Sequence, residues 1–328
     1  MSSFSPQSLL FVLLFLLASH QCAEARYLQT SKELFCSVYT FGDSFVDPGN
    51  NDFINTPFRS NFPPYGRDFP GGVPTGRFSN GLLFPDILAH YVGANALQLF
   101  EQLDIFEEYK LRLENAIGKK KADSQIERAI FYVNAGSDDF AFTYFHDGIG
   151  QPNKNPRDYE QFLLLFIRRF FKRLLDQGAR KIAVNGLPPL GCIPVGITLL
   201  PQPAKNTEDK ARACIGYVNA ISQDFNSMLQ EELEDLQSQH PKTKIVYIDF
   251  VEPLLDVIQD PHEYGYTEVN KGCCGTGLSE IGTQCNATTS LCSDSDKYVF
   301  WDAAHPTEKT YHLIFRSNLG AIDDLIGS

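Results

Sequence analysis

Four short apolar runs recur along the chain, and longer segments with helical spacing of apolar residues separate them. The runs lack the alternation of a half-exposed strand and predict buried strands at residues 37–41, 129–134, 181–185 and 244–249. The intervening patterns predict helices at residues 82–91, 101–117, 157–177, 209–237 and 306–319. Buried strands that alternate with helices are typical of a parallel sheet covered on both faces, so the sequence predicts an α/β fold.

Glycine-containing and polar segments follow the predicted strands. FGDSF comes after the first strand, NAGSDDF after the second and NGLPPLGC after the third, while Asp249 ends the fourth. Because the carboxyl ends of parallel strands meet at one edge of the sheet, we expect a functional site at that edge.

The beginning of the chain has the pattern of a secretory signal, with an apolar run at residues 9–18 and a small-x-small end at residues 23–25. We therefore expect residues 1–25 to be a signal peptide. Residues 26–328 are expected to form a single domain, because no repeat, low-complexity tract or linker composition interrupts them. No later segment is apolar for long enough to cross a bilayer, so a secreted protein without an integral membrane segment is predicted.

The net charge of the chain bears on its possible partners. The formal net charge is -12, and an acidic surface repels the phosphates of nucleic acids. The composition therefore argues against a nucleic-acid partner.

The cysteines fit an exported protein. Cys273, Cys274, Cys285 and Cys292 predict a loop stapled by disulfides, with zinc as the less favoured reading because no CxxC pair is present. Cys192 and Cys214 are expected to form a third pair, which leaves Cys36 as a buried free thiol. The sequon at Asn286 lies inside the stapled loop and is a predicted glycosylation site if that loop is exposed.

The candidate catalytic residues lie near opposite ends of the chain. Ser44 stands in a turn after the first predicted strand, and Asp302 stands three residues before His305. A carboxylate can fix the tautomer of such a histidine, which can then take the proton of a serine hydroxyl. By themselves these residues also fit a structural interpretation, in which Ser44 is a turn residue and Asp302 caps a helix beside a surface histidine.

Six ordered motifs bear on that choice: FGDSFVDPGNN, YGRDFPGGVPTGRFSNG, FYVNAGSDDF, AVNGLPPLGCIP, GCCGTG and YVFWDAAHPTEKTYH. On these motifs, which extend over nearly the whole mature sequence, the chain resembles the plant GDSL esterase/lipase family of SGNH hydrolases. The resemblance implies a flavodoxin-like three-layer α/β/α sandwich with a mainly parallel sheet. It also implies that Ser44 attacks an ester carbonyl, that His305 acts as base and then acid, and that Asp302 orients His305. No cofactor and no metal are implied, and the expected location is the cell wall or apoplast.

Residues near Ser44 have expected supporting roles. Gly42 should permit a tight turn, and Asp43 and Asp47 should brace the loop by accepting hydrogen bonds from backbone amides. Arg77 and Asn80 lie in the glycine-rich loop GGVPTGRFSNG, residues 71–81. They are expected either to contact substrate or to brace this loop.

The oxyanion hole is where the chain departs from the family pattern. The resemblance implies donors from Ser44, Gly136 and position 138, but the family's asparagine is replaced here by Asp138. An ionised carboxylate has no proton to donate, so Asp138 could serve only if its pKa were raised by burial or by Asp139.

A glycine-containing block of the family is also absent after Gly93, where the chain runs directly from one predicted helix into the next. The second, edge strand of the sheet is therefore expected to be missing. Gly93 or Ala94 at the join could supply a substitute amide.

The predicted function is a secreted serine carboxylic-ester hydrolase that forms an acyl-enzyme. A lipid, a polyester and an acetylated polysaccharide all remain open as substrates. The alternatives are a catalytically impaired extracellular binding protein, favoured by Asp138 and the absent block, and an acyltransferase that uses the same residues.

Overall fold

A computed structural model describes residues 37–53, 59–92, 95–98, 102–145, 155–201 and 212–327. Its centre is a five-stranded parallel sheet in the order β2-β1-β3-β4-β5. The strands are β1 (Ser37–Phe41), β2 (Asn95–Gln98), β3 (Ile130–Val133), β4 (Lys181–Asn185) and β5 (Lys244–Ile248). The predicted α/β fold with a parallel sheet is confirmed. In this strand order the direction of winding reverses between β1 and β3, where ligands bind in open α/β sheets.

The prediction that the edge strand is missing was wrong. Residues Asn95–Gln98 form β2 and pair in parallel with Ser37–Thr40 of β1. The segment NALQ has a polar residue at each end and so carries no apolar strand pattern, and its pairing with β1 makes it a strand.

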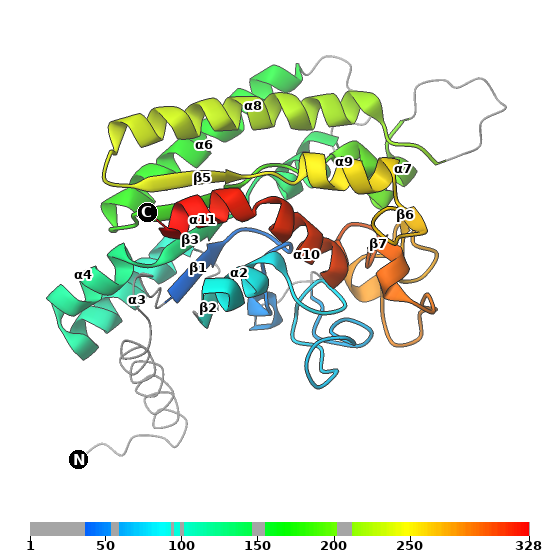
Figure 1. Ribbon diagram of the computed structural model, residues 1–328, viewed down its shortest axis with the longest axis horizontal. Helices are drawn as coiled ribbons and strands as arrows, with labels where there is room; N and C mark the ends of the chain where they lie inside the picture. The colour runs from blue at the N-terminus through cyan, green and yellow to red at the C-terminus, as the bar shows by residue number, and fades with distance from the viewer. Residues whose placement is uncertain are drawn as a thin grey trace.

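Helices cover both faces of the sheet (Figure 1). One face carries α2 (Phe84–Val92), α10 (Glu308–Ser317) and α11 (Leu319–Gly327). The other carries α3 (Gln102–Ile117), α6 (Pro156–Asp176) and α8 (Gly216–Gln239). These layers arise because side chains alternate along β1 and β3. Phe41 packs against Phe106 of α3 and Phe170 of α6, whereas Tyr132 stacks on Phe84 of α2.

The remaining elements are short and lie mostly at the ends of the sheet. They are α4 (Lys119–Glu127), the π-helical turn η3 (Asp139–Tyr144), α7 (Pro194–Leu199), α9 (Val251–Gln259), β6 (Glu268–Gly272), β7 (Tyr298–Phe300) and the 3-10 turns η2 (Asn50–Phe53), η4 (Leu190–Cys192), η5 (Gly282–Gln284) and η6 (Ser295–Lys297). The helix predicted at 209–237 begins only at Gly216, since residues 212–215 are not helical and Cys214 is tied there to Cys192. The sequence did not predict α4, α7, α9, β6 or β7.

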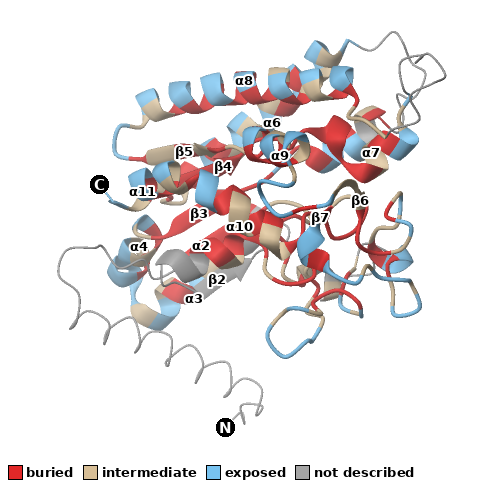
Figure 2. Ribbon diagram, turned by 45° about the vertical axis from the view of Figure 1, so that its right-hand side comes forward, coloured by how far each residue is buried: buried red, intermediate tan, exposed pale blue. Residues whose placement is uncertain are grey.

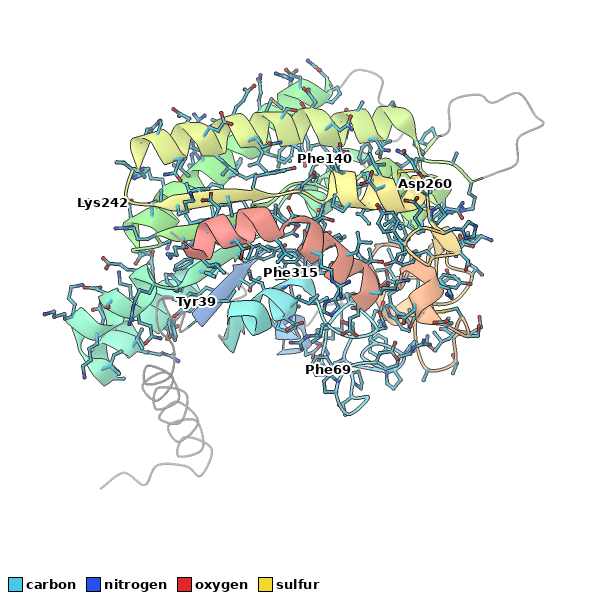
Figure 3. All side chains as sticks on the ribbon, in the orientation of Figure 1. Tyr39, Phe69, Phe140, Lys242, Asp260 and Phe315 are labelled. Carbon is cyan, nitrogen blue, oxygen red and sulfur yellow. A yellow bond between two sulfur atoms is a disulfide. The ribbon has the colours of Figure 1, made fainter. Side chains whose placement is uncertain are left out.

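The buried side chains form two clusters. The large one fills the space between the sheet and its helices, and Figure 2 shows the buried inner sides of α8 and α10 facing it. Figure 3 shows Tyr39 on β1 and Phe315 on α10, both of which belong to this cluster. The small one lies beside the sheet and contains Tyr65, Phe78, Cys273, Cys274, Cys285 and Trp301.

Three disulfides join described cysteines. Cys192–Cys214 is present as predicted, and Cys273–Cys292 together with Cys274–Cys285 close the predicted stapled loop. The cysteines of this loop are therefore not metal ligands. Cys36 and the predicted signal peptide lie outside the described residues. Within the described part of the chain, no helix is both long and apolar enough to span a membrane.

Candidate active site

Ser44 lies in the loop that follows β1 at the carboxyl edge of the sheet. The preceding Gly42 has a φ of +150°, and a Cβ at this position would stand 2.1 Å from the carbonyl oxygen of Asn134. Only glycine lets the loop pass so close to the end of β3. Asp43 accepts a hydrogen bond from the amide of Phe45 at 3.1 Å. Both features hold the turn that presents Ser44.

Asp47 braces the other end of this loop. Its Oδ1 accepts hydrogen bonds from the amides of Gly49 at 2.8 Å and Asn50 at 2.6 Å. The bracing predicted for Asp43 and Asp47 is confirmed.

Asp302 and His305 lie in the connection between β7 and α10. Oδ1 of Asp302 accepts hydrogen bonds from the amides of Ala304 and His305, each at 2.8 Å, which folds the segment into a tight turn. The helix then begins after Thr307, whose hydroxyl accepts a hydrogen bond from the amide of Thr310. The carboxylate therefore stabilises a turn before the helix rather than capping the helix itself.

The structure brings Ser44, His305 and Asp302 together. Oγ of Ser44 lies 2.7 Å from Nε2 of His305, and Nδ1 of His305 lies 2.9 Å from both carboxylate oxygens of Asp302. Because a carboxylate only accepts hydrogen bonds, Nδ1 carries the proton and Nε2 accepts from the serine hydroxyl. Asp302 is fully buried and His305 is 2% exposed.

Two aromatic rings flank the imidazole. The ring of Phe45 lies 5.2 Å from it and that of Phe78 lies 4.9 Å from it, centroid to centroid. These contacts restrict rotation of the His305 ring.

Comparisons with known proteins show the family of the chain. The family described as GDSL-like Lipase/Acylhydrolase matches residues 38–317. The chain belongs to this family. Membership in the GDSL family places it among hydrolases that act on ester bonds.

Two relatives and one solved structure illustrate the extent of the similarity. A GDSL esterase/lipase of Arabidopsis thaliana is 37% identical over 90% of this chain and 89% of its own length. GDSL esterase/lipase APG of the same plant is 35% identical over 97% of this chain and 98% of its own length. The crystal structure of Axe2, an acetylxylan esterase from Geobacillus stearothermophilus, aligns with 88% of this chain and 96% of its own at 11% identity and a TM-score of 0.38.

Gly136 and Asp138, two of the predicted oxyanion residues, lie at the end of β3 in this GDSL-family chain. Gly136 has a φ of +110°, and Asp138 precedes η3, which is held by the ring of Phe140 packed 5.4 Å from that of Phe225. Figure 3 shows Phe140 beneath α8. Gly93 and Ala94 lie outside the described residues.

Asp138 belongs to a group of carboxylates near His305. Its side chain is exposed, yet surrounding protein atoms desolvate the carboxylate and raise its pKa; the nearby His305 lowers this pKa, and Asp139 raises it. Desolvation, with a further contribution from Asp138, raises the pKa of Asp43 well above its usual value. Oδ2 of Asp43 is buried without a hydrogen-bond partner. Both carboxyl groups are therefore protonated more readily than ordinary aspartates.

A chain of buried polar groups links the strand ends to Asp43. The hydroxyl of Tyr132 donates to Asn185, Asn185 donates to Asn134, and Asn134 donates to Oδ1 of Asp43, at 2.8, 2.7 and 2.7 Å. Sequence reasoning did not find this network. Its signal is the polar residue at the end of two otherwise apolar strands, Asn134 and Asn185.

A cavity of about 470 Å³ opens at the carboxyl ends of β1, β3 and β4 and runs beneath α6. Gly42, Asp43, Gly136 and Asp138 line its polar end. Its apolar wall comes mainly from α6: Phe162, Leu163, Phe166, Ile167, Phe170 and Phe171.

Arg77, Asn80 and Asn286 do not line this cavity. Arg77 forms an ion pair with Asp86, with a shortest distance of 2.6 Å, and Asn80 donates to Asp68 at 2.7 Å; both therefore brace the glycine-rich loop. Asn286 is partly exposed on the disulfide loop, and its side-chain oxygen accepts from the hydroxyl of Thr288 at 2.7 Å.

Proposed function

We propose that this chain hydrolyses carboxylic esters through an acyl-enzyme, with Ser44 as nucleophile, His305 as general base and acid, and Asp302 as the residue that orients His305. The observation that carries the proposal is the continuous chain of hydrogen bonds from Ser44 Oγ through the imidazole to Asp302, at 2.7 and 2.9 Å. A serine hydroxyl is a weak nucleophile and needs a base within hydrogen-bond reach.

The reaction then has two steps. Ser44 Oγ bonds to the ester carbonyl carbon while its proton passes to Nε2 of His305, which gives that proton to the leaving alcohol. Water next attacks the acyl-enzyme, His305 takes its proton, and the carboxylic acid leaves as Ser44 regains a proton. The negative charge on the carbonyl oxygen is assigned to amides at Ser44 and Gly136, with Asp138 as a donor when it is protonated.

The cavity beneath α6 favours an ester with an apolar acyl chain. Its polar end adjoins Gly42 and Asp43, immediately before Ser44, and its apolar wall has the character of a site for hydrocarbon. We therefore place acyl esters of lipid or polyester type ahead of acetylated polysaccharides as substrates.

Secretion is part of the same proposal. Residues 1–25 have the pattern of a signal peptide, and disulfides persist in proteins of oxidising compartments. We propose residues 26–328 as one extracellular domain of the cell wall or apoplast.

The test compares the purified protein with Ser44→Ala on p-nitrophenyl esters. We expect kcat to fall at least about 1,000-fold in the variant, because removal of the nucleophile abolishes acyl-enzyme formation. Circular dichroism of both proteins checks that the variant is folded. Equal rates for the two forms would contradict the proposal.

Asp138 favours a second candidate, an extracellular binding protein with an impaired site. A carboxylate opposite the developing oxyanion weakens catalysis without disturbing ligand binding. Reaction of Ser44 with a fluorophosphonate probe at neutral pH distinguishes the two, since labelling that is lost in Ser44→Ala requires an activated serine.

A further inference from the structure

Tyr65 touches the buried side of the Ser44–His305–Asp302 site. It lies 237 positions before Asp302 in the sequence, and its hydroxyl donates a hydrogen bond to Oδ2 of Asp302 at 2.7 Å. The side chain is 1% exposed, so water does not compete for this contact. Tyr65 therefore approaches the site from the side of the carboxylate.

The direction of this hydrogen bond is fixed from the other side. The amide of Gly282 donates to the hydroxyl oxygen of Tyr65 at 2.8 Å. Since the amide supplies one hydrogen to that oxygen, the hydroxyl's own hydrogen is directed to Asp302. Gly282 lies within the loop that the Cys274–Cys285 disulfide closes, so the disulfide loop sets the position of the donor.

The ring of Tyr65 is also held in place. Phe62 lies 5.8 Å from it, Phe78 lies 5.7 Å from it and Trp301 lies 6.4 Å from it, centroid to centroid and all near edge-to-face. Trp301 directly precedes Asp302 in the chain. The aromatic cluster therefore fixes the hydroxyl relative to the backbone that carries the carboxylate.

The two oxygens of Asp302 are held differently. Oδ1 accepts hydrogen bonds from the amides of Ala304 and His305. Oδ2 accepts hydrogen bonds from the Tyr65 hydroxyl and from the imidazole of His305. Burial, and then the negative charge of Asp302, raise the pKa of Tyr65 well above its usual value. The hydroxyl thus stays protonated and remains a donor across the range in which an esterase works.

Other ionisable groups also face this site. Asp138 faces His305 from the start of η3, and Tyr311 of α10 faces Asp302. Tyr65 and Ser44 are hydrogen-bonded to Asp302 and His305, respectively.

We propose that Tyr65 is a positioning residue for catalysis, which locks the rotation of the Asp302 carboxylate so that both oxygens face Nδ1 of His305. The proposal rests on the function assigned above to Ser44, Asp302 and His305. The Tyr65 hydroxyl also stabilises the negative charge of Asp302. Without this hydrogen bond, the carboxylate stabilises the protonated imidazole of His305 more strongly.

The test is Tyr65→Phe, which keeps the ring and removes the hydroxyl. Tyr266→Phe is the matched control, because Tyr266 is also fully buried and its hydroxyl is hydrogen-bonded to Thr310 at 3.1 Å, away from Asp302. For Tyr65→Phe we expect kcat to fall roughly 10- to 100-fold with KM nearly unchanged, since a misplaced base slows chemistry more than binding. The acid limb of the kcat pH profile should move to higher pH, and Tyr266→Phe should show neither change.

A second readout does not depend on turnover. In protein labelled with ¹⁵N-histidine, the low-field proton resonance of His305 Nδ1 reports its hydrogen bond to Asp302, and it should shift in Tyr65→Phe alone. An unchanged resonance, or equal shifts in the two variants, overturns the positioning role. If the resonance shifts as expected while wild type and Ser44→Ala are equally inactive on esters, the positioning role stands and the proposed hydrolysis fails.

Discussion

Asp138 is the residue at which this chain departs from the asparagine of the family motif. Desolvation raises its pKa and His305 partly opposes that effect, so the carboxyl becomes a hydrogen-bond donor only as the pH falls. His305 must be neutral to act as a base, which requires the opposite change in pH. The two requirements conflict, and the amide of an asparagine would remove the conflict.

Asp138→Asn should therefore increase activity. We expect kcat on p-nitrophenyl esters at neutral pH to rise about 10- to 100-fold, because one oxyanion donor contributes on the order of 100-fold or more. The gain should shrink towards acid pH, where wild-type Asp138 is protonated more often. The measurement is kcat across a pH series.

Asp139→Asn is the control for this prediction. It removes the same charge from the next residue, which is also exposed and also has a pKa raised by desolvation. Equal gains in both variants would mean that the effect is the loss of charge near His305 rather than a new donor.

At the same scale, the sequence revealed some of the site and not the rest. Ser44, Asp302 and His305 were predicted because six ordered motifs together resemble one family, whereas each residue by itself also fitted a structural role. Nothing local relates Tyr65 to Asp302, since their contact exists only after folding. The hydrogen bond between Asn185 and Asn134 likewise depends on the register of β3 and β4.

At the scale of elements, α6 provides the apolar wall of the cavity. A helix was predicted at residues 157–177. In the structure it begins at Pro156, and Asn155 is the N-cap that accepts a hydrogen bond from the amide of Arg157. The sequence could not predict which of its phenylalanines face solvent, because Phe162 and Phe166 line the cavity and are still 51% and 52% exposed.

Filling this cavity should change acyl preference. Ile167→Trp places a bulky ring in the apolar wall, and we expect kcat/KM for p-nitrophenyl octanoate to fall about 50-fold relative to the acetate ester. That figure corresponds to roughly three methylenes excluded from an apolar site at about 0.8 kcal/mol each.

Leu165→Trp is the matched variant on the same helix, at a position that is 52% exposed and does not line the cavity. It should leave the ratio of octanoate to acetate unchanged. A parallel fall for both esters in Ile167→Trp would mean that the cavity does not hold the acyl chain.

The strands illustrate the limits of local pattern at this scale. β1, β3, β4 and β5 were predicted because buried parallel strands are continuous apolar runs. β2 was not, since NALQ has a polar residue at each end and is no apolar run. β6 was not predicted because its sequence EVNKG is mostly polar, and β7 was not predicted because it has only three residues.

At the scale of the whole molecule, distant segments are tied together beside the sheet. Residues 60–80, the disulfide loop and the connection after β7 meet in the small aromatic and disulfide cluster. The carbonyl of Glu280 accepts from the amide of Ala303 at 3.0 Å, and the amide of Glu308 donates to Asn80 at 3.0 Å. No linear pattern predicts that these three segments pack together, although the motifs indicate which segments take part.

The side chain of Glu280 stabilises the disulfide loop in this packed arrangement. Its oxygens accept hydrogen bonds from the amides of Thr276, Leu278 and Ser279 at 2.9 to 3.2 Å. Desolvation alone would raise the pKa of Glu280, but these hydrogen bonds outweigh it and lower the pKa from 4.5 to about 2. A lowered carboxyl pKa stabilises the folded state above pH 4.5, and that stabilisation is lost as the pH falls to about 2.

Glu280→Gln should therefore lower the free energy of unfolding by about 1.5–3 kcal/mol at pH 7, the usual range for hydrogen bonds to a charged group. The difference from wild type should shrink as the pH falls from about 4.5 towards 2. Urea denaturation over a pH series measures it. Glu263→Gln, at an exposed site, should change stability by less than about 0.5 kcal/mol; a similar loss in both variants would contradict a specific role for Glu280.

Ser44 and His305 are separated by 261 positions, so translation makes the serine long before the histidine that contacts it in the fold. A nascent chain on the ribosome, or a product of premature termination before codon 302, carries the hydroxyl without the imidazole that activates it. Under the proposed function, such polypeptides should lack esterase activity until the segment that carries His305 is made.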